Sequence, residues 1–258
     1  MNGIKIVGTG YAAPSKIVTN DDLAKIVETN DEWITSRTGI SRRRHMAEGE
    51  TFTSITVATL TPDTLVPSAA CLLQRELGLP MDIPCFDLNA ACTGFLYALH
   101  TMECLLAVSE RKYGLVIGAE NLSRIINWED RGTCILFGDG AGAAVVESRA
   151  EWNSISAVLG CHGDGQILEK TGLTIDDVDF FVFHQANARI IDLVVRKYHI
   201  PQEKYYKNIA EYGNTSAASI PLVIGELHEM GKVGHGSRVL VVGFGGGLTW
   251  GGALVEFA

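Results

Sequence analysis

The stretch Asp87–Phe95, DLNAACTGF, places a cysteine where a strand turns into a helix. A strand-like segment, IPCF, leads into it, and a long helical pattern, FLYALHTMECLLAVSE, follows. A cysteine at a helix N-terminus meets the positive end of the helix dipole and unpaired N–H groups, which lower the pKa of its thiol. The small side chains around it leave space beside the sulfur for a substrate carbon. Cys92 is therefore either a nucleophile or, like most buried cysteines, an inert apolar side chain.

Two further polar residues stand at the ends of elements. His184 follows the strand-like FFVF and precedes the helical ARIIDLVVRKY, and Asn214 lies in the loop EYGNTSAAS just before another helix. Each is weak evidence alone, because a histidine at a strand end is usually structural and asparagine after glycine is ordinary turn chemistry. Together with Cys92 they form a set of one soft nucleophile, one imidazole and one amide donor.

The chain alternates between strand and helix patterns, which predicts an α/β fold with layered sheets and helices. We expect strands at Tyr113–Ala119, Thr133–Phe137 and Gly142–Glu147, and the pattern restarts after Ala150. CFDLNAACTGFLYAL and FFVFHQANARIIDLV both read as strand, polar corner and helix. This echo predicts two similar halves, residues 1–150 with the cysteine and residues 151–258 with the histidine and asparagine.

Composition excludes several classes of function. The 258 residues, 47% hydrophobic and 20% charged, suit one large globular domain or two halves, and a net charge of −9 offers no overall field for nucleic acid. The local basic patches Arg42–Arg44 and Arg196–Lys197 are expected to be solvated faces. No signal peptide or membrane span is predicted, and the function needs no membrane partner.

Cysteine usage indicates a reducing compartment. The six cysteines form no CxxC pair and no dense framework, so we expect free thiols in a cytoplasmic protein. Cys71 and Cys104 lie inside helical patterns and are expected to be inert and buried. The histidines show no metal-ligand spacing, so no metal site is expected. The GDGAG stretch at Gly138–Gly142 precedes a strand rather than a helix, which favours a tight turn over a nucleotide loop.

Several blocks, taken in order along the chain, resemble β-ketoacyl-acyl-carrier-protein synthase III, a thiolase-fold condensing enzyme. They are DEWITSRTGISRR, TPDTLVPSAACLLQ, NAACTGF, DRGTCILFGDGAGAAVV, HQANARI, YGNTSAAS and GFGGGLTWGGALVEF. The resemblance implies a thiolase-like α/β fold, in which duplicated βαβ halves form a five-layered αβαβα sandwich. It also implies an acyltransferase that initiates fatty acid biosynthesis as a homodimer.

The implied reaction is a decarboxylative Claisen condensation of acetyl-CoA, or another short acyl-CoA, with malonyl-acyl-carrier protein. Cys92 would carry the acyl group as a thioester, and the backbone N–H groups of Cys92 and Gly246 would form an oxyanion hole. His184 and Asn214 would hold the oxygen of the malonyl-derived enolate. No cofactor is implied, because CoA and phosphopantetheine arrive with the substrates.

The resemblance also assigns residues to substrate binding. Those matched to the CoA nucleotide, the pantetheine arm or the primer pocket are Trp33, Arg37, Val66, Arg131, Gly132, Ala186 and Asn187. Arg189, Arg196 and Lys197 share one helix face, since their spacing is seven and eight residues, and they would dock the acidic carrier protein.

The chain departs from the family pattern at two abrupt junctions, near residues 55–56 and 165–166. The first leaves no room for a crossover helix, and the family has longer segments at both places. Alternative interpretations therefore stay open. One is a related thiolase-fold condensing enzyme, either one that uses malonyl-CoA or one of the chalcone-synthase-like enzymes and 3-hydroxy-3-methylglutaryl-CoA synthases, which share the Cys/His/Asn set. Another is a non-catalytic CoA-binding or carrier-binding homologue. A papain-like hydrolase shares the order Cys, His, Asn but lacks the local CGSCW-type signature.

Overall fold

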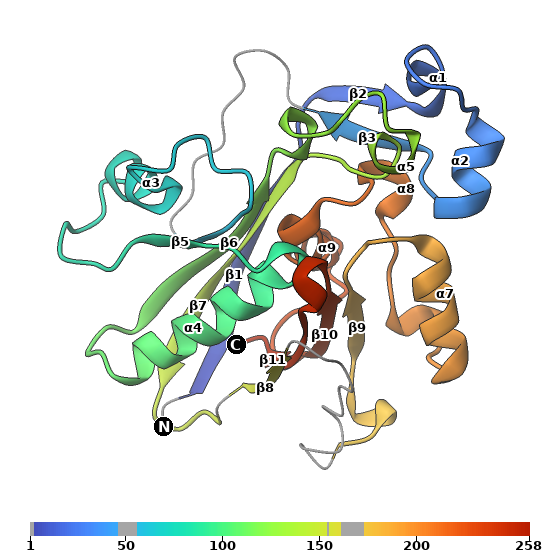
Figure 1. Ribbon diagram of the computed structural model, residues 1–258. Coiled ribbons are helices and arrows are strands. Elements are labelled where there is room, and N and C mark those ends of the chain that lie inside the picture. Colours follow the sequence, from blue (N-terminus) through green and yellow to red (C-terminus); the bar gives the residue numbers. More distant parts are fainter. Residues whose placement is uncertain (1–2, 46–55, 154, 161–172) are drawn as a thin grey trace.

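Two β-sheets alternate with helices in the computed structural model, which describes residues 3–45, 56–153, 155–160 and 173–258 (Figure 1). The five-stranded sheet has the order β1-β7-β6-β4-β5, and the four-stranded sheet has the order β8-β11-β10-β9. The strands of the first sheet are β1 (Gly3–Ala12), β4 (Thr56–Ala58), β5 (Phe86–Leu88), β6 (Tyr113–Glu120) and β7 (Gly140–Arg149). Those of the second are β8 (Ser156–Gly160), β9 (Phe180–Phe183), β10 (Arg238–Phe244) and β11 (Trp250–Glu256).

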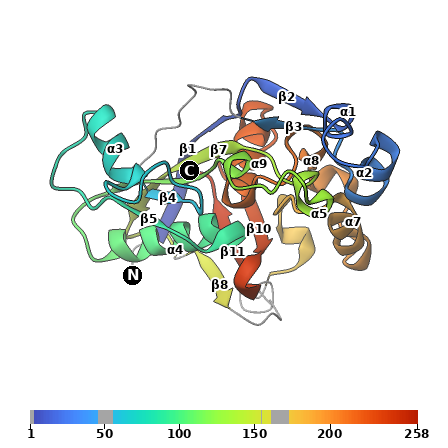
Figure 2. The same cartoon turned by 45° about the horizontal axis from the view of Figure 1, so that its top comes forward.

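The helices form three layers around these sheets (Figures 1 and 2). α4 (Gly94–Ala107) and α9 (Ser219–Glu229) lie between the sheets, since α4 packs on β6 and β11 and α9 packs on β7 and β9. α3 (Ala69–Glu76) covers β4 and β5 from outside, and α7 (Ala188–Lys197) shares a hydrophobic cluster with β9 and β10. The described residues thus form the five-layered αβαβα sandwich expected of a thiolase-like α/β fold.

The distribution of apolar residues explains which helix takes which layer. α9 buries every residue from Ser219 to Leu227, as a helix between two sheets must, whereas α7 buries only the stripe of Ile191 and Val195. Both the Cys92 and the His184 corner run from a strand through a polar residue into a helix, as expected, but the two helices lie in different layers. α4 and α9 occupy equivalent layers, while the helix that follows His184 lies on the outer face.

A smaller unit lies at one end of the sheets. It contains the hairpin of β2 (Lys16–Thr19) and β3 (Arg42–His45), with α1 (Asn20–Leu23), α2 (Asp31–Thr38) and α5 (Arg131–Cys134), near α8 (Ile209–Tyr212). The remaining short elements are the 3₁₀ helices η1 (Ala91–Thr93), η2 (Leu122–Arg124), η3 (Ile175–Asp177), η4 (Gln202–Lys204), η5 (Ser216–Ala218) and η6 (Gly246–Leu248). Asn30 caps α2 with its side chain, and Gly39 ends that helix at φ 76°.

The expectation that the basic patch Arg42–Arg44 is a solvated face is wrong for Arg43, whereas Arg42 is exposed. Arg43 is wholly buried, donating to the Val18 and Ile135 carbonyl oxygens and to Asn20 Oδ1, and burial lowers its pKa to about 10. Arg42 pairs with Glu211, with 2.6 Å between Nε and Oε2. The guanidinium of Arg43 therefore ties the hairpin to α1 and to the end of α5.

Three further expectations need correction. The segment expected as a strand at Thr133–Phe137 instead continues α5 into a turn, since Asp130 caps the N-terminus of that helix. Cys71 and Cys104 are exposed rather than buried, although both lie on helices. The tight turn expected at GDGAG is absent, since Gly140–Gly142 belong to β7, although the close backbone packing expected there is present: a Cβ at Gly138 would lie 2.0 Å from the Tyr212 carbonyl oxygen. The abrupt junction near residues 165–166 lies outside the described residues. At the junction near residues 55–56, Ile55 also lies outside them.

Candidate active site

Cys92 lies in η1, between the edge strand β5 and the central helix α4. The turn is built from local hydrogen bonds: the Ala91 N–H donates to Asn89 Oδ1 at 3.1 Å, and Thr93 Oγ1 donates to the Ala90 carbonyl oxygen at 2.7 Å. Ala91 has φ 46°, in the left-handed region that side chains other than glycine rarely adopt. The backbone is thus held in an uncommon conformation directly beside the thiol.

The glycine-rich segment after β10 packs against this turn. A Cβ at Gly245 would lie 2.8 Å from Cys92 Cβ and 2.9 Å from its backbone nitrogen, so only glycine fits there. The backbone N–H groups of Gly246 and of Cys92 itself both interact with the sulfur. Both N–H groups act to lower the pKa of the thiol, and their role as oxyanion-hole donors stays a prediction.

One short segment, from Asn214 to Ser219, contacts all three predicted catalytic residues. It contains Asn214, whose Oδ1 accepts the Ser216 N–H at 2.9 Å and leaves the amide NH₂ as the group able to donate. Ser216 interacts with the Cys92 thiol, and Ser219 Oγ lies 2.6 Å from His184 Nδ1. The structure thus gathers Cys92, His184 and Asn214 around the start of α9.

His184 lies at the carboxyl end of β9, and its N–H donates to the Val242 carbonyl oxygen of β10 at 2.8 Å. The ring is 2% exposed and meets Phe244 edge-on, with 5.8 Å between ring centroids. Burial lowers the pKa of His184 to about 4, because removal from water disfavours the charged imidazolium. The imidazole is therefore neutral at physiological pH.

The expectation of a lowered thiol pKa is wrong. Burial raises the pKa of Cys92, and this effect outweighs the interactions with the Ser216 hydroxyl and the Gly246 N–H, which act in the opposite direction. The thiol keeps partial access to solvent. Cys92 is consequently a thiol in the resting protein, and its proton must leave during acyl transfer.

A buried carboxyl group that sequence reasoning missed lies near the thiol. Glu120, at the end of β6, is 1% exposed and accepts hydrogen bonds from Thr61 Oγ1 at 2.7 Å and from the Leu60 N–H at 3.1 Å. Burial raises its pKa, and its charge in turn raises that of Cys92. The Ser216 hydroxyl acts to lower the pKa of both Cys92 and Glu120, although its geometry to neither group is that of a regular hydrogen bond. A glutamate ending the apolar run GLVIGA was the available sequence signal.

A second cluster brings together the residues assigned to the CoA nucleotide. The guanidinium carbons of Arg37 and Arg131 each lie 4.4 Å from the centre of the Trp33 ring. Asn187 caps α7 and donates from Nδ2 to the Arg37 carbonyl oxygen at 3.0 Å, which connects this cluster to the His184 corner. An indole flanked by two cations is suited to a planar base that carries phosphates.

The other predicted binding residues lie near these clusters or on the surface. The Gly132 N–H donates to Asp130 Oδ1 at 2.8 Å in the first turn of α5, and the Ala186 N–H donates to the His184 carbonyl oxygen at 3.0 Å. Val66 is 88% exposed and lines a surface cavity of about 530 Å³ that Leu88 and Asn89 also line. The roles of these residues stay predictions.

The predicted carrier-protein face is exposed. Arg189, Arg196 and Lys197 are exposed on α7, and Leu193, 63% exposed, lies among them. Arg196 Nε donates to the Asp192 carbonyl oxygen, while the nearby carboxylate of Asp192 pairs with Lys207 instead. The cationic groups of this face are therefore available to an acidic partner.

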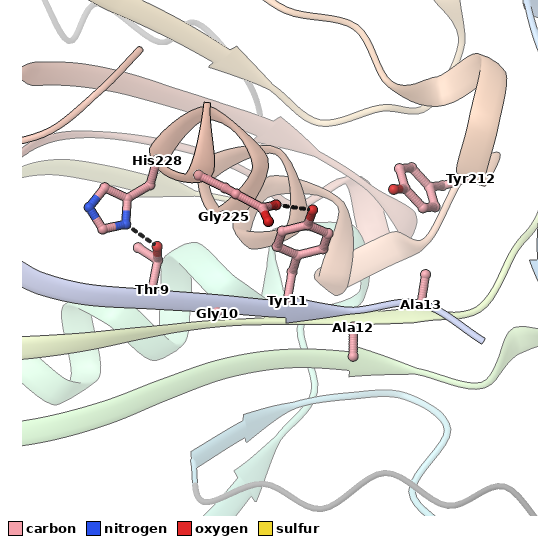
Figure 3. A pocket seen from close by; sticks show the side chains of 9 residues that line it. Thr9, Gly10, Tyr11, Ala12, Ala13, Tyr212, Gly225 and His228 are labelled. Carbon is pink, nitrogen blue, oxygen red and sulfur yellow. Dashed lines mark hydrogen bonds between the residues drawn. The ribbon is translucent and has the colours of Figure 1, made fainter. Parts of the chain in front are cut away.

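A polar cavity of about 590 Å³ lies elsewhere, between β1 and the end of α9 (Figure 3). The Tyr11 hydroxyl donates to Glu229 at 2.5 Å, and Thr9 Oγ1 lies 2.8 Å from His228 Nδ1. None of the predicted site residues lines this cavity. Its polar side chains already pair with each other, so it is a poor candidate for the active centre.

Searches for other kinds of site gave no candidate. Among the described residues no three or more His, Cys, Asp or Glu side chains gather as metal ligands do. No helix there combines the length and apolar character needed to cross a bilayer. The expectation that the protein needs no metal stays a prediction.

Comparison with known proteins identifies the family. The family model 3-oxoacyl-[acyl-carrier-protein] synthase III matches residues 86–163, and the model for the C terminal part of the same synthase matches residues 168–257. The chain belongs to the 3-oxoacyl-[acyl-carrier-protein] synthase III family. The first matched region contains Cys92, and the second contains His184 and Asn214.

Relatives in this family match along their whole length. The chain is 39% identical to a beta-ketoacyl-[acyl-carrier-protein] synthase III of Clostridium acetobutylicum, covering 100% of this chain and 99% of that one. It is 42% identical to the synthase III of Acholeplasma laidlawii, with 98% of each chain covered. The crystal structure of the Aquifex aeolicus synthase III superposes with a TM-score of 0.90 at 40% identity, covering 99% and 100% of the two chains.

The chain is shorter than these synthase III relatives inside the matched region. The first alignment runs over 324 positions, whereas this chain has 258 residues. The relatives therefore carry additional residues between the shared blocks, in agreement with the two abrupt junctions of the sequence. Family membership also removes the papain-like alternative.

Proposed function

We propose that this protein condenses an acyl-CoA primer with malonyl-acyl-carrier protein, the decarboxylative step that starts a fatty acid chain. The observation that carries the proposal is the segment from Asn214 to Ser219, which joins Cys92, His184 and an amide donor in one site. Family membership supports the same reaction class. The primer is acetyl-CoA or another short acyl-CoA.

In the first half-reaction Cys92 Sγ attacks the thioester carbonyl carbon of the primer. The N–H groups of Cys92 and Gly246 stabilise the tetrahedral oxyanion. The C–S bond to CoA then breaks, and the proton lost by Cys92 is balanced by protonation of the CoA thiolate. The products are acyl-Cys92 and free CoA.

In the second half-reaction malonyl-acyl-carrier protein loses CO₂, and the electrons of the broken C–C bond form an enolate. A neutral His184 and the Asn214 amide donate hydrogen bonds to the enolate oxygen. The carbanion attacks the acyl-Cys92 carbonyl, the C–S bond to Cys92 breaks as the 3-ketoacyl-carrier protein forms, and the departing thiolate takes up one proton from solvent to restore the resting thiol. Each such donor typically lowers the barrier by roughly 3–4 kcal/mol.

Two groups of residues outside the Cys92 site bind the two substrates. Trp33, Arg37 and Arg131 hold the CoA nucleotide, and the cationic face of α7 binds the acidic carrier protein. No further cofactor takes part, since the substrates bring CoA and phosphopantetheine. The free cysteines among the described residues support a reducing compartment such as the cytoplasm.

The assembly we propose is a homodimer. β5 is an edge strand of the five-stranded sheet, so its outer backbone groups have no partner strand among the described residues. The exposed apolar side chains of Leu65 and Val66, each 88% exposed, lie on the preceding segment. Pairing of this edge with a second copy would cover both features.

The test is intact-protein mass spectrometry before and after incubation with acetyl-CoA. One added acetyl group, absent in Cys92→Ser, is the expected result. Release of CO₂ from malonyl-acyl-carrier protein by the wild type then establishes the second half-reaction. If malonyl-CoA gave product while malonyl-carrier protein gave none, the condensation would belong to the malonyl-CoA branch of the fold.

The second candidate, a non-catalytic CoA-binding or carrier-binding homologue, is favoured by the shorter chain. Relatives carry additional residues that this chain lacks. Binding of acetyl-CoA with no acyl adduct, in protein of about the 27.8 kDa expected for these residues, would select this alternative.

A further inference from the structure

Ser219, at the first position of α9, makes the closest contact of His184. Its Oγ lies 2.6 Å from His184 Nδ1 and accepts a hydrogen bond from the Gln185 N–H at 3.3 Å. His184 and Ser219 are each 2% exposed and Gln185 is 1% exposed. The His184 ring and the Gln185 N–H are therefore both hydrogen-bonded to the Ser219 hydroxyl in a site shielded from bulk water.

The two neutral forms of the imidazole differ in whether the Ser219 hydroxyl has an acceptor for its proton. A serine hydroxyl has one proton to donate and two lone pairs, and the Gln185 N–H occupies one lone pair. If Nδ1 carried the ring proton, it would occupy the second lone pair, and the Ser219 O–H would need another acceptor. Among the described residues Ser219 Oγ has no acceptor other than Nδ1 with which it forms a hydrogen bond.

A buried O–H without an acceptor is unfavourable, because it loses its bond to water and gains none in exchange. With the proton on Nε2 instead, the Ser219 O–H donates to Nδ1, and all three groups are satisfied. Within the described chain Nε2 makes no hydrogen bond, so its proton stays available to a ligand.

From this geometry we infer that Ser219 is a positioning residue, which fixes His184 in the tautomer that carries its proton on Nε2. The inference deepens the proposed function and rests on it for its catalytic meaning. A ring with Nε2–H donates a hydrogen bond to the enolate oxygen, whereas the other tautomer would present a lone pair to a negative charge. The low pKa of His184 agrees, because a neutral ring has a tautomer to select.

The direct test is a ¹⁵N–¹H correlation spectrum of protein labelled with ¹⁵N-histidine, in which His184 is assigned by comparison with His184→Gln. We expect the wild type to show a protonated Nε2 and an unprotonated Nδ1 at neutral pH. Protonation of Nδ1 would overturn the inference, and this readout does not depend on turnover.

The functional test uses Ser219→Ala, with Ser219→Thr as the variant that keeps the hydroxyl. In Ser219→Ala we expect the Nε2–H signal to weaken, malonyl-carrier-protein decarboxylation to fall at least about tenfold, and acylation of Cys92 to stay within about twofold. Ser219→Thr should restore the tautomer and much of the decarboxylation.

The matched control is Ser148→Ala, which removes another buried serine hydroxyl, one without a hydrogen-bond partner, from β7. It should leave both the tautomer and the decarboxylation unchanged. An unchanged tautomer and decarboxylation rate in Ser219→Ala would refute the positioning role. If the wild type shows Nε2–H but releases no CO₂, the proposed function fails while the tautomer assignment stands.

Discussion

The guanidinium carbon of Arg131 lies 4.4 Å from the centre of the Trp33 ring, although the two residues belong to different helices, α5 and α2. Arg37 lies at the same distance from that ring. The indole is thus flanked by cations that a nucleotide's phosphates can engage, and its ring can stack on a base.

Replacing Trp33 by alanine tests this nucleotide site. Stacking of one base on an aromatic side chain is worth about 1–3 kcal/mol, so Trp33→Ala should weaken acetyl-CoA binding about tenfold or more. Acetyl-pantetheine, which lacks the nucleotide, should bind equally to both proteins. Trp152→Ala is the control, since Trp152 also has cations over its ring, Lys5 at 5.3 Å and Arg149 at 4.9 Å. Equal losses in calorimetric titrations of the two variants would contradict the assignment.

Removing either of the two proposed enolate donors, His184 or Asn214, should impair the second half-reaction and spare the first. His184→Ala and Asn214→Ala should each lower malonyl-carrier-protein decarboxylation about 10²–10³-fold while Cys92 still accepts an acetyl group. The measurement pairs released CO₂ with the intact mass of the same samples. His235→Ala, at an exposed histidine, serves as the control. Full decarboxylation in both site variants would show that other groups bind the enolate.

Charge reversal on α7 should affect the carrier protein alone. Arg196→Glu should raise the KM for malonyl-carrier protein severalfold, because it replaces attraction by repulsion, and the effect should shrink in high salt. The KM for acetyl-CoA should not change. Lys232→Glu reverses an exposed charge beyond α9 and provides the matched comparison. Equal effects of the two variants would place the docking surface elsewhere.

Glu120 should govern the pH dependence of thiol reactivity. A carboxylate near Cys92 disfavours the thiolate and raises the thiol pKa, in addition to the effect of burial. Glu120→Gln removes that charge, so the midpoint for alkylation of Cys92 by iodoacetamide should shift to lower pH. Glu229→Gln, at the exposed Tyr11 contact, should leave the midpoint unchanged. A shift to higher pH would mean that Glu120 assists deprotonation instead.

Local patterns, together with the family resemblance, predicted three positions that the structure brings into one site. Cys92, His184 and Asn214 each follow a strand or turn that the residue types specify, and the structure brings all three together. The α/β layers followed from the alternation of strands and helices. The placement of α9 between the sheets could have been inferred from the small and apolar residues of its first two turns, all of which are buried, whereas α4 also carries polar residues such as His100 and Thr101.

Other features depend on residues that are distant in sequence. Arg43 looked like part of a charged surface, yet its two terminal guanidinium nitrogens donate to Asn20 and to the Ile135 carbonyl oxygen inside the protein. The pKa of the Cys92 thiol is raised because η5 and η6 pack against η1 and bury it. This effect of burial exceeds the lowering of the pKa that the sequence suggested from the helix dipole. Exposure of Cys71 and Cys104 likewise depends on which face of each helix meets the sheets.

Backbone geometry around the thiol has a cost for the whole molecule. Ala91, Ser216 and Leu248 all have φ near +50° and lie in η1, η5 and η6, the three turns that meet at Cys92. Each such residue disfavours the folded state by about 1–2 kcal/mol relative to a relaxed conformation. A selection for heat resistance alone would therefore favour glycine at these positions, and the resulting proteins would gain thermal tolerance while the catalytic turns lost their rigidity. Directed evolution for higher thermal stability with retained activity should therefore keep Ala91, Ser216 and Leu248 unchanged and select stabilising substitutions at other positions.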